Sequence, residues 1–237
     1  MAKSGQMGRK NKLGRFSDLM SYPNVYENFD THNPHLIGQN NEPVELKGEW
    51  AKKHFGNTHP ITLELACGRG EYTVALAKRY PERNFIGVDI KGARIWKGAT
   101  YALEENLKNV AFLRTRIEFI EKFFASGEIS NMWITFPDPF PRKSKANRRL
   151  TGDMFLEKYK AFLPIGGRIH LKTDADTLYE FTLEVLGSRS DYKSVTDSSD
   201  IYAGDLPHPD LDIQTYYEGR HLEAGKKIKY VQIERIN

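Results

Sequence analysis

The chain has 237 residues, a formal net charge of +4, and 39% hydrophobic and 12% aromatic residues, enough for a real core in one large or two small domains. A single cysteine, Cys67, excludes an intrachain disulfide and a cysteine-based zinc site, which suits a reducing cytosol. No apolar run approaches the roughly 18 residues of a membrane span, and no apolar segment follows the N-terminal charges as in a secretory signal. We therefore expect a cytoplasmic protein without a membrane partner and without a metal.

Charge is unevenly distributed. Residues 1–15 carry five cations and no acid, and residues 139–152 carry another five cations and no acid. Such blocks favour a polyanionic partner, although a solvated tail and a solvated loop would look the same. Residues 1–30 are polar and weakly patterned, so we predict a flexible basic tail there and a single domain over residues 31–237.

Along the chain, polar turn material over residues 31–60 contains one short helix, near residues 46–55. Strands and helices then alternate. The predicted strands are 61–66, 84–89, 109–114, 131–136, 166–173, 192–197 and 227–236. The predicted helices are 71–80, 92–108, 117–125, 152–163, 174–186 and 213–225. This alternation predicts an α/β fold with a mainly parallel seven-stranded sheet covered on both faces. Ligands should then bind beyond the carboxyl ends of the strands.

A glycine turn, ELACGRGE, follows the first of these strands. Gly68 and Gly70 allow a sharp turn close to a ligand. Asp89 ends the second strand, where a carboxylate can bind both hydroxyls of a ribose. NAD and S-adenosylmethionine (SAM) sites share these features, but a dinucleotide site wants a third glycine where this chain has Thr73. Glu64, just ahead of the glycines, resembles the first motif of class I SAM-dependent methyltransferases.

The stretch FPDPFPRKSKANRRL follows the fourth strand. Its prolines stiffen the backbone on both sides of Asp138, as a preorganised carboxylate requires. An ordinary turn residue is the alternative interpretation of Asp138.

This segment closely resembles the FPDPWPKKRHHKRRL segment of bacterial tRNA (guanine-N7-)-methyltransferases. LELACGRGE, NFIGVDI, GDMFLEKYKAFLPIGGRIHLKTD and TYYEGRHLEAGKKIKY resemble other elements of that family, so the match spans roughly residues 60–235. The resemblance implies a Rossmann-like class I methyltransferase that uses SAM and acts on tRNA, as a monomer or a homodimer.

Residue by residue, the resemblance implies a catalytic role for Asp138. The cofactor-binding residues would be Glu64, Gly68, Gly70, Asp89, Arg116, Ile117 and Asp138. The substrate-binding residues would be Arg142, Asp174, Thr215 and Glu218, and the run Lys143, Lys145, Arg148 and Arg149 would bind RNA. Three positions depart from the family: Ala66 replaces a glycine, Arg142 a lysine, and Arg116-Ile117 an Asp-Ala pair near the adenine.

Guanine N7 has an exposed lone pair, so its methylation needs no strong base. A fixed carboxylate can instead orient the base and stabilise its developing positive charge. Three other functions stay open from the sequence: a class I methyltransferase of a protein or small molecule, an RNA-binding module with a vestigial cofactor pocket, and an NAD enzyme.

Overall fold

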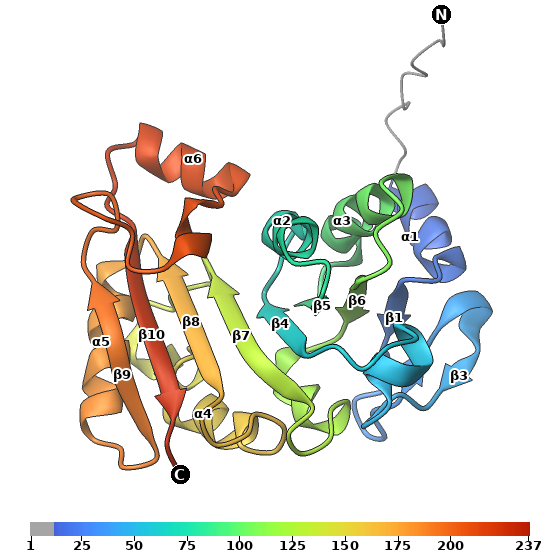
Figure 1. Cartoon of the computed structure of the whole chain (residues 1–237), viewed down its shortest axis with the longest axis horizontal. Helices are drawn as coiled ribbons and strands as arrows, with labels where there is room; N and C mark the ends of the chain where they lie inside the picture. The colour runs from blue at the N-terminus through green and yellow to red at the C-terminus, as the bar shows by residue number, and fades with distance from the viewer. Residues whose placement is uncertain (1–11) are drawn as a thin grey trace, which may run out of the picture.

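The computed structural model describes residues 12–237, and its centre is one sheet with the strand order β3-β2-β1-β6-β5-β4-β7-β8-β10-β9 (Figure 1). The strands are β1 (Val25–Glu27), β2 (Leu36–Ile37), β3 (Pro43–Val44), β4 (Ile61–Leu65), β5 (Asn84–Asp89), β6 (Val110–Arg114), β7 (Ile129–Thr135), β8 (Arg168–Thr173), β9 (Tyr192–Ser198) and β10 (Lys229–Arg235). The run from β1 through β6, β5, β4 and β7 to β8 is parallel, and β10 pairs antiparallel with both β8 and β9.

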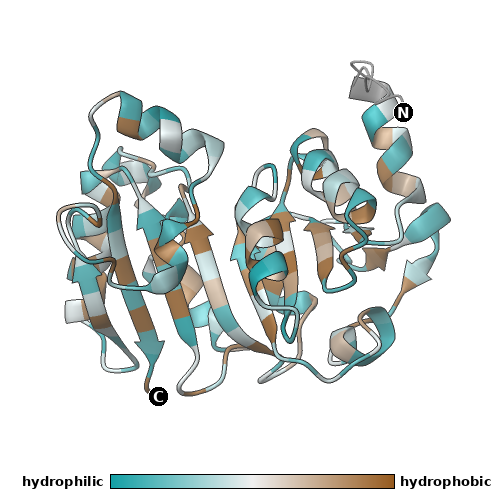
Figure 2. Cartoon of the chain, turned by 45° about the horizontal axis from the view of Figure 1, so that its top comes forward, coloured by the Kyte–Doolittle hydropathy of each residue, from teal (hydrophilic) through white to brown (hydrophobic). Residues whose placement is uncertain are grey.

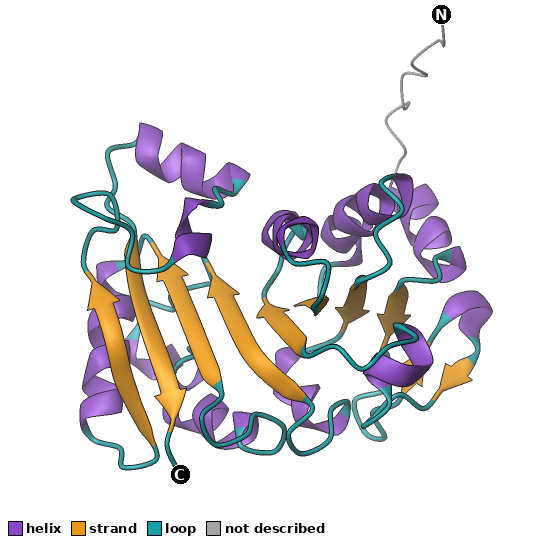
Figure 3. Cartoon of the chain, in the orientation of Figure 1, coloured by secondary structure: helices purple, strands orange, loops and turns teal. Residues whose placement is uncertain are grey.

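Helices lie on both sides of this sheet (Figure 3). The α-helices are α1 (Lys12–Ser21), α2 (Glu71–Arg79), α3 (Gly92–Glu104), α4 (Asp153–Tyr159), α5 (Asp176–Gly187) and α6 (Tyr216–Glu223). Short helical turns are η1 (Gln39–Asn41), η2 (Trp50–His54), η3 (Ile117–Lys122), η4 (Lys143–Arg148) and η5 (Pro209–Asp212). Among residues 12–237, no helix is long and apolar enough to cross a membrane.

Two apolar cores follow from the alternation of side chains along the strands. On one face, Leu63 and Leu65 of β4 join the side chains of α4, α5 and η3. On the other face, Phe85 of β5 and Phe112 of β6 pack against α2 and α3. The strands accordingly carry the strongest hydropathy in Figure 2, and the helices are mixed. The α/β class and the coverage of both faces are thus confirmed.

The sheet has three more strands than the seven predicted. β1 pairs with β6, and β2 and β3 extend the sheet beyond it. Two- and three-residue strands carry too few side chains for a periodic pattern, so β1 fell within the predicted tail, and β2 and β3 fell within the predicted turn material of residues 31–60. Part of the predicted tail is also ordered, because α1 packs on α3 and β1 belongs to the sheet. Residues 1–11 of that predicted tail lie outside the described residues.

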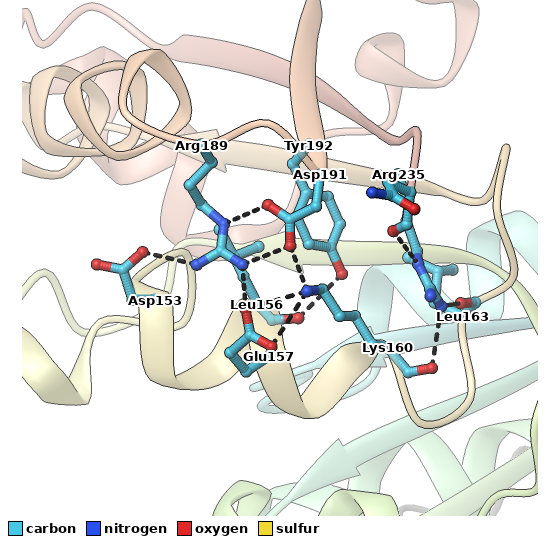
Figure 4. A network of polar contacts seen from close by, with 10 residues as sticks. Asp153, Leu156, Glu157, Lys160, Leu163, Arg189, Asp191, Tyr192 and Arg235 are labelled. Carbon is cyan, nitrogen blue, oxygen red and sulfur yellow. Dashed lines mark hydrogen bonds and ion pairs between the residues drawn. The ribbon is translucent and has the colours of Figure 1, made fainter.

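An ionic network ties α4 to the turn before β9 (Figure 4). The Arg189 guanidinium donates to Asp191 at 2.8 Å and to Asp153 at 2.7 Å, and it also contacts Glu157. Lys160 Nζ lies 2.5 Å from Asp191. These bonds hold the pKa of the Asp191 carboxyl well below its ordinary value. The network stabilises the edge of the sheet at β9. It includes no residue of the glycine turn or of the Pro-Asp-Pro loop.

Candidate cofactor and RNA site

The chain reverses direction across the sheet between β4 and β7. From β4 it proceeds through β5 to β6, and it then returns to β7 on the other side of β4. Two cavities lie at this switch point, where the fold predicts a ligand. The outer cavity, of about 360 Å³, is lined by residues that include Asp89, Ile117 and Asp138. The inner cavity, of about 70 Å³, is lined by residues that include Glu64 and Gly68.

The glycine turn leads from β4 into α2. Ala66 has φ of +60°, in the left-handed region that favours glycine. Gly68 lines the inner cavity and also has positive φ, and a Cβ there would lie 4.0 Å from the Ala66 carbonyl oxygen. A Cβ on Gly70 would lie 2.5 Å from the Phe112 ring. Gly68 therefore borders the cavity, whereas Gly70 allows α2 to pack closely on the sheet.

Glu64 is the buried acid of the site. One oxygen accepts bonds from the backbone N–H and the hydroxyl of Thr73, and the other accepts from the Thr135 hydroxyl at 2.5 Å. Burial raises the pKa of Glu64 to about 7 despite these donors. Thr73 occupies the position where a dinucleotide site would have glycine, and its bond to Glu64 has no sequence pattern that predicts it. The three donors fix a carboxylate that a cationic ligand would keep ionised.

Asp89 ends β5 at the mouth of the outer cavity. Its two oxygens accept from the backbone N–H groups of Gly68 at 3.0 Å and Lys91 at 2.7 Å. Asp89 thus links the glycine turn to the start of α3. Ile117 also lines this cavity. Arg116 lines it too, but its exposed guanidinium lies 3.7 Å from Glu118.

The Pro-Asp-Pro loop forms one wall of the outer cavity. Asp138 Oδ1 accepts from the backbone N–H of Phe140 at 3.0 Å, so the loop is an Asx turn. Phe136, at the end of β7, has φ of +48° and lines both cavities. The loop therefore holds the exposed carboxylate of Asp138 beside the cavity on a stiff backbone.

The basic run divides into two groups. Arg142, Lys143, Lys145 and Arg148 are exposed. Arg149 is buried, its guanidinium donates to the carbonyls of Pro139 and Phe140, and it lies over the Phe181 ring at 4.3 Å. In this structure the donors of Arg149 hold the Pro-Asp-Pro loop in shape, and its RNA-binding role stays a prediction.

The segment Thr215 to Glu218 begins α6, which lies beyond the ends of β7 and β8 (Figure 1). Thr215 lines the inner cavity and caps the helix by accepting from the Glu218 N–H at 3.2 Å. The Glu218 side chain is fully buried, accepts from Tyr202, and pairs with Lys172. In this conformation Glu218 anchors α6 and does not line either cavity.

Asp174 forms contacts with α6 and with the residues that follow this helix. Its carboxylate lies 2.5 Å from Lys226 Nζ and 3.4 Å from His221 Nδ1. The His221 ring stacks on Phe136, with the ring centroids 5.6 Å apart. Asp174 thus connects α6, through His221, to Phe136 in the wall of the site. Thr215 borders a cavity, whereas Asp174 lines neither the outer nor the inner cavity.

The arrangement suits a ligand with a ribose and a cationic end. Asp89 lines the outer cavity, and Glu64 lines the inner one. Asp138 and Arg148, an exposed cation of the basic run, also line the outer cavity. These features define a class I methyltransferase.

Solved structures agree on the fold: the 16S rRNA methyltransferase KamB has a TM-score of 0.61 at 13% identity, covering 83% of this chain and 97% of that one. A 16S rRNA (adenine(1408)-N(1))-methyltransferase with cosubstrate SAM has a TM-score of 0.60 at 16% identity, covering 83% and 94%.

The particular family follows from sequence comparison. A family model described as "Putative methyltransferase" matches residues 58–231. A tRNA (guanine-N(7)-)-methyltransferase of Bacteroides thetaiotaomicron is 48% identical over 94% of this chain and 85% of its own length. The enzyme of that name from Christiangramia forsetii is 46% identical over 96% and 99%. The chain belongs to the tRNA (guanine-N7-)-methyltransferase family, and the resemblance seen in its motifs is confirmed.

Proposed function

We infer that this protein transfers a methyl group from SAM to N7 of a guanine in tRNA. The single observation that carries this inference is the juxtaposition of Asp138 with exposed cations beside a cavity at the switch point of a methyltransferase sheet. Relatives with that activity in their names extend over almost the whole chain. We place the cytoplasm as its compartment, because its tRNA substrate is found there.

The residues fit the cofactor. Asp89 would accept from the ribose hydroxyls, Glu64 would face the cationic methionine end, and Gly68 would let the ligand approach the backbone. Ile117 would contact the adenine, and Arg116 is turned toward Glu118 at the rim. When bound, SAM supplies an electrophilic methyl group to an already nucleophilic N7.

We assign Asp138 the electrostatic role in this reaction. N7 loses its lone pair to the new bond, so positive charge develops on the guanine ring. A carboxylate already held by the Phe140 N–H needs no reorganisation to stabilise that charge. No proton leaves N7 during the transfer, so Asp138 acts through its charge and not as a base.

Exposed cations would hold the tRNA around this acid. Arg148 lines the outer cavity, and Arg142, Lys143 and Lys145 are exposed close to it in the chain. None of the four has a carboxylate partner among residues 12–237. Phosphate contacts of this kind position the RNA and supply affinity, but they read no sequence. Choice of one guanine must come from tRNA shape and from contacts to a splayed base.

Transfer of labelled methyl from SAM to unmodified tRNA, followed by nucleoside analysis, tests the proposal. We expect 7-methylguanosine as the labelled product. Labelling of a protein extract instead would favour a methyltransferase of another substrate. Absence of SAM binding by calorimetry, with tRNA binding intact, would favour an RNA-binding module with a vestigial pocket.

A further inference from the structure

Arg94 lies where the two cavities meet. It belongs to the first turn of α3, it is exposed, and it lines both the outer and the inner cavity. No motif in the sequence singled it out. Its guanidinium therefore lies between the inner cavity, which the glycine turn lines, and the outer cavity, which the Pro-Asp-Pro loop lines.

The charge of Arg94 is uncompensated within residues 12–237, where its side chain has no ion pair, hydrogen bond or ring contact. Except for Lys91, which lines the outer cavity only, the other cations that line the cavities contact a protein group. Arg69 lies over Tyr216 at 4.7 Å and 3.9 Å from Glu71, and Arg116 lies 3.7 Å from Glu118. Arg148 lies over Phe140 at 5.8 Å. Of the two arginines that line the inner cavity, Arg94 is therefore the one with its donors available.

Two carboxylates that line the cavities, Glu64 and Asp89, already accept hydrogen bonds from the protein. Both oxygens of Glu64 accept from threonine side chains or backbone, and both oxygens of Asp89 accept from backbone N–H groups. A guanidinium presents five donors in a fork that matches two anionic oxygens. Because Arg94 forms no ion pair with a described acid, its guanidinium is suited to an anionic group of a ligand.

We propose that Arg94 binds a pair of anionic oxygens at the junction of the two cavities, and so helps to position the reactants. The proposal rests on the proposed function, which supplies two sources of such oxygens. One is the carboxylate of the methionine end of SAM. The other is the phosphate of the target nucleotide.

The test compares Arg94→Gln with Lys97→Gln, a matched control that removes one exposed cation from the same helix outside both cavities. Calorimetry measures binding of SAM and of decarboxylated SAM, which keeps the sulfonium and the amine but lacks the carboxylate. If Arg94 holds the carboxylate, Arg94→Gln weakens SAM binding by about tenfold or more, as for a lost charge-assisted hydrogen bond. Binding of decarboxylated SAM stays the same in all three proteins.

The second arm measures tRNA affinity at several salt concentrations. If Arg94 holds a phosphate, SAM binding is unchanged, while tRNA binding weakens and the slope of log affinity against log salt flattens by about one unit. Lys97→Gln changes neither quantity by as much. Equal SAM affinity and equal tRNA salt slope in Arg94→Gln and the wild type would overturn the proposal. A wild type that binds no SAM would instead refute the proposed function itself.

Discussion

Lys172 Nζ lies 2.7 Å from Glu218 Oε2, and both side chains are completely shielded from solvent. Lys172 also donates to the carbonyls of Leu211 and Ile213 at 3.0 and 2.9 Å. Burial lowers the pKa of the lysine, and the partner carboxylate opposes that shift. One strand residue thus fastens α6 and the segment before it over the site.

Lys172→Met should leave the Glu218 carboxylate buried without its cation. The expected loss in free energy of unfolding is about 3–5 kcal/mol, because an uncompensated buried charge is costly. Combining Lys172→Met with Glu218→Leu removes both charges and should recover part of that loss. Urea denaturation measures the three proteins. A double variant whose loss equals the sum of the two single losses would show that the charges do not act as a pair.

Glu64 makes cofactor binding depend on pH. Because burial raises the pKa of Glu64 to about 7, the free protein holds a proton there at pH 6 and loses it by pH 8. The ionised form attracts the cationic end of SAM, so SAM affinity should rise about tenfold from pH 6 to pH 8. Glu64→Gln should weaken binding at pH 8 and lose this part of the pH dependence. The same rise with pH in Glu64→Gln would assign it to another group.

The same raised pKa has a consequence for the free protein. The folded state keeps a proton that the unfolded chain releases near pH 4.5, so the contribution of Glu64 to stability is greatest below that pH. That contribution declines as pH rises toward 7. Bound SAM should offset the decline, which thermal unfolding with and without the cofactor would measure.

Asp138→Asn tests charge separately from shape. The asparagine oxygen can still accept from the Phe140 N–H, so the Asx turn should persist. Loss of the negative charge should lower single-turnover methylation by about 10²–10³, while tRNA affinity stays equal or rises. Normal single-turnover rates in this variant would make Asp138 a turn residue only.

Exposed and buried members of the basic run should behave differently. Changing Lys143, Lys145 and Arg148 to Ala should weaken tRNA binding and flatten its log–log salt slope by about two to three units. Arg149→Ala should instead reduce stability by about 1–3 kcal/mol, because the carbonyls of Pro139 and Phe140 lose their donor. A salt slope unchanged in the triple variant would place the RNA elsewhere on the surface.

The sequence predicted those parts of the site that depend on local patterns. The glycine turn, Asp89 and the Pro-Asp-Pro loop follow strands whose apolar runs are continuous, so their meeting at one edge of the sheet could be inferred. Burial of Arg149 and Glu218 could not be inferred, because their partners Phe181 and Lys172 are distant in the chain. The position of Arg94 at the cavities could not be predicted, because a single cation on a helix surface belongs to no recognisable sequence pattern.

The tertiary context also changed the meaning of one recognised motif. Thr215-x-x-Glu218 has the spacing of a capping box, and Thr215 does cap α6. Glu218, however, turns inward to Lys172 and Tyr202 instead of returning to the helix start. A residue expected at the substrate therefore supports the element that borders it.

Methylation at guanine N7 of tRNA can be tested with one pair of tRNA transcripts. One tRNA transcript contains guanosine, and its twin contains 7-deazaguanosine, which has a carbon in place of N7. With labelled SAM, the guanosine transcript should gain methyl groups recovered as 7-methylguanosine, and the deaza transcript should bind but gain none. Equal labelling of the two transcripts would rule out transfer to N7, because the methyl group would then have been transferred to another atom.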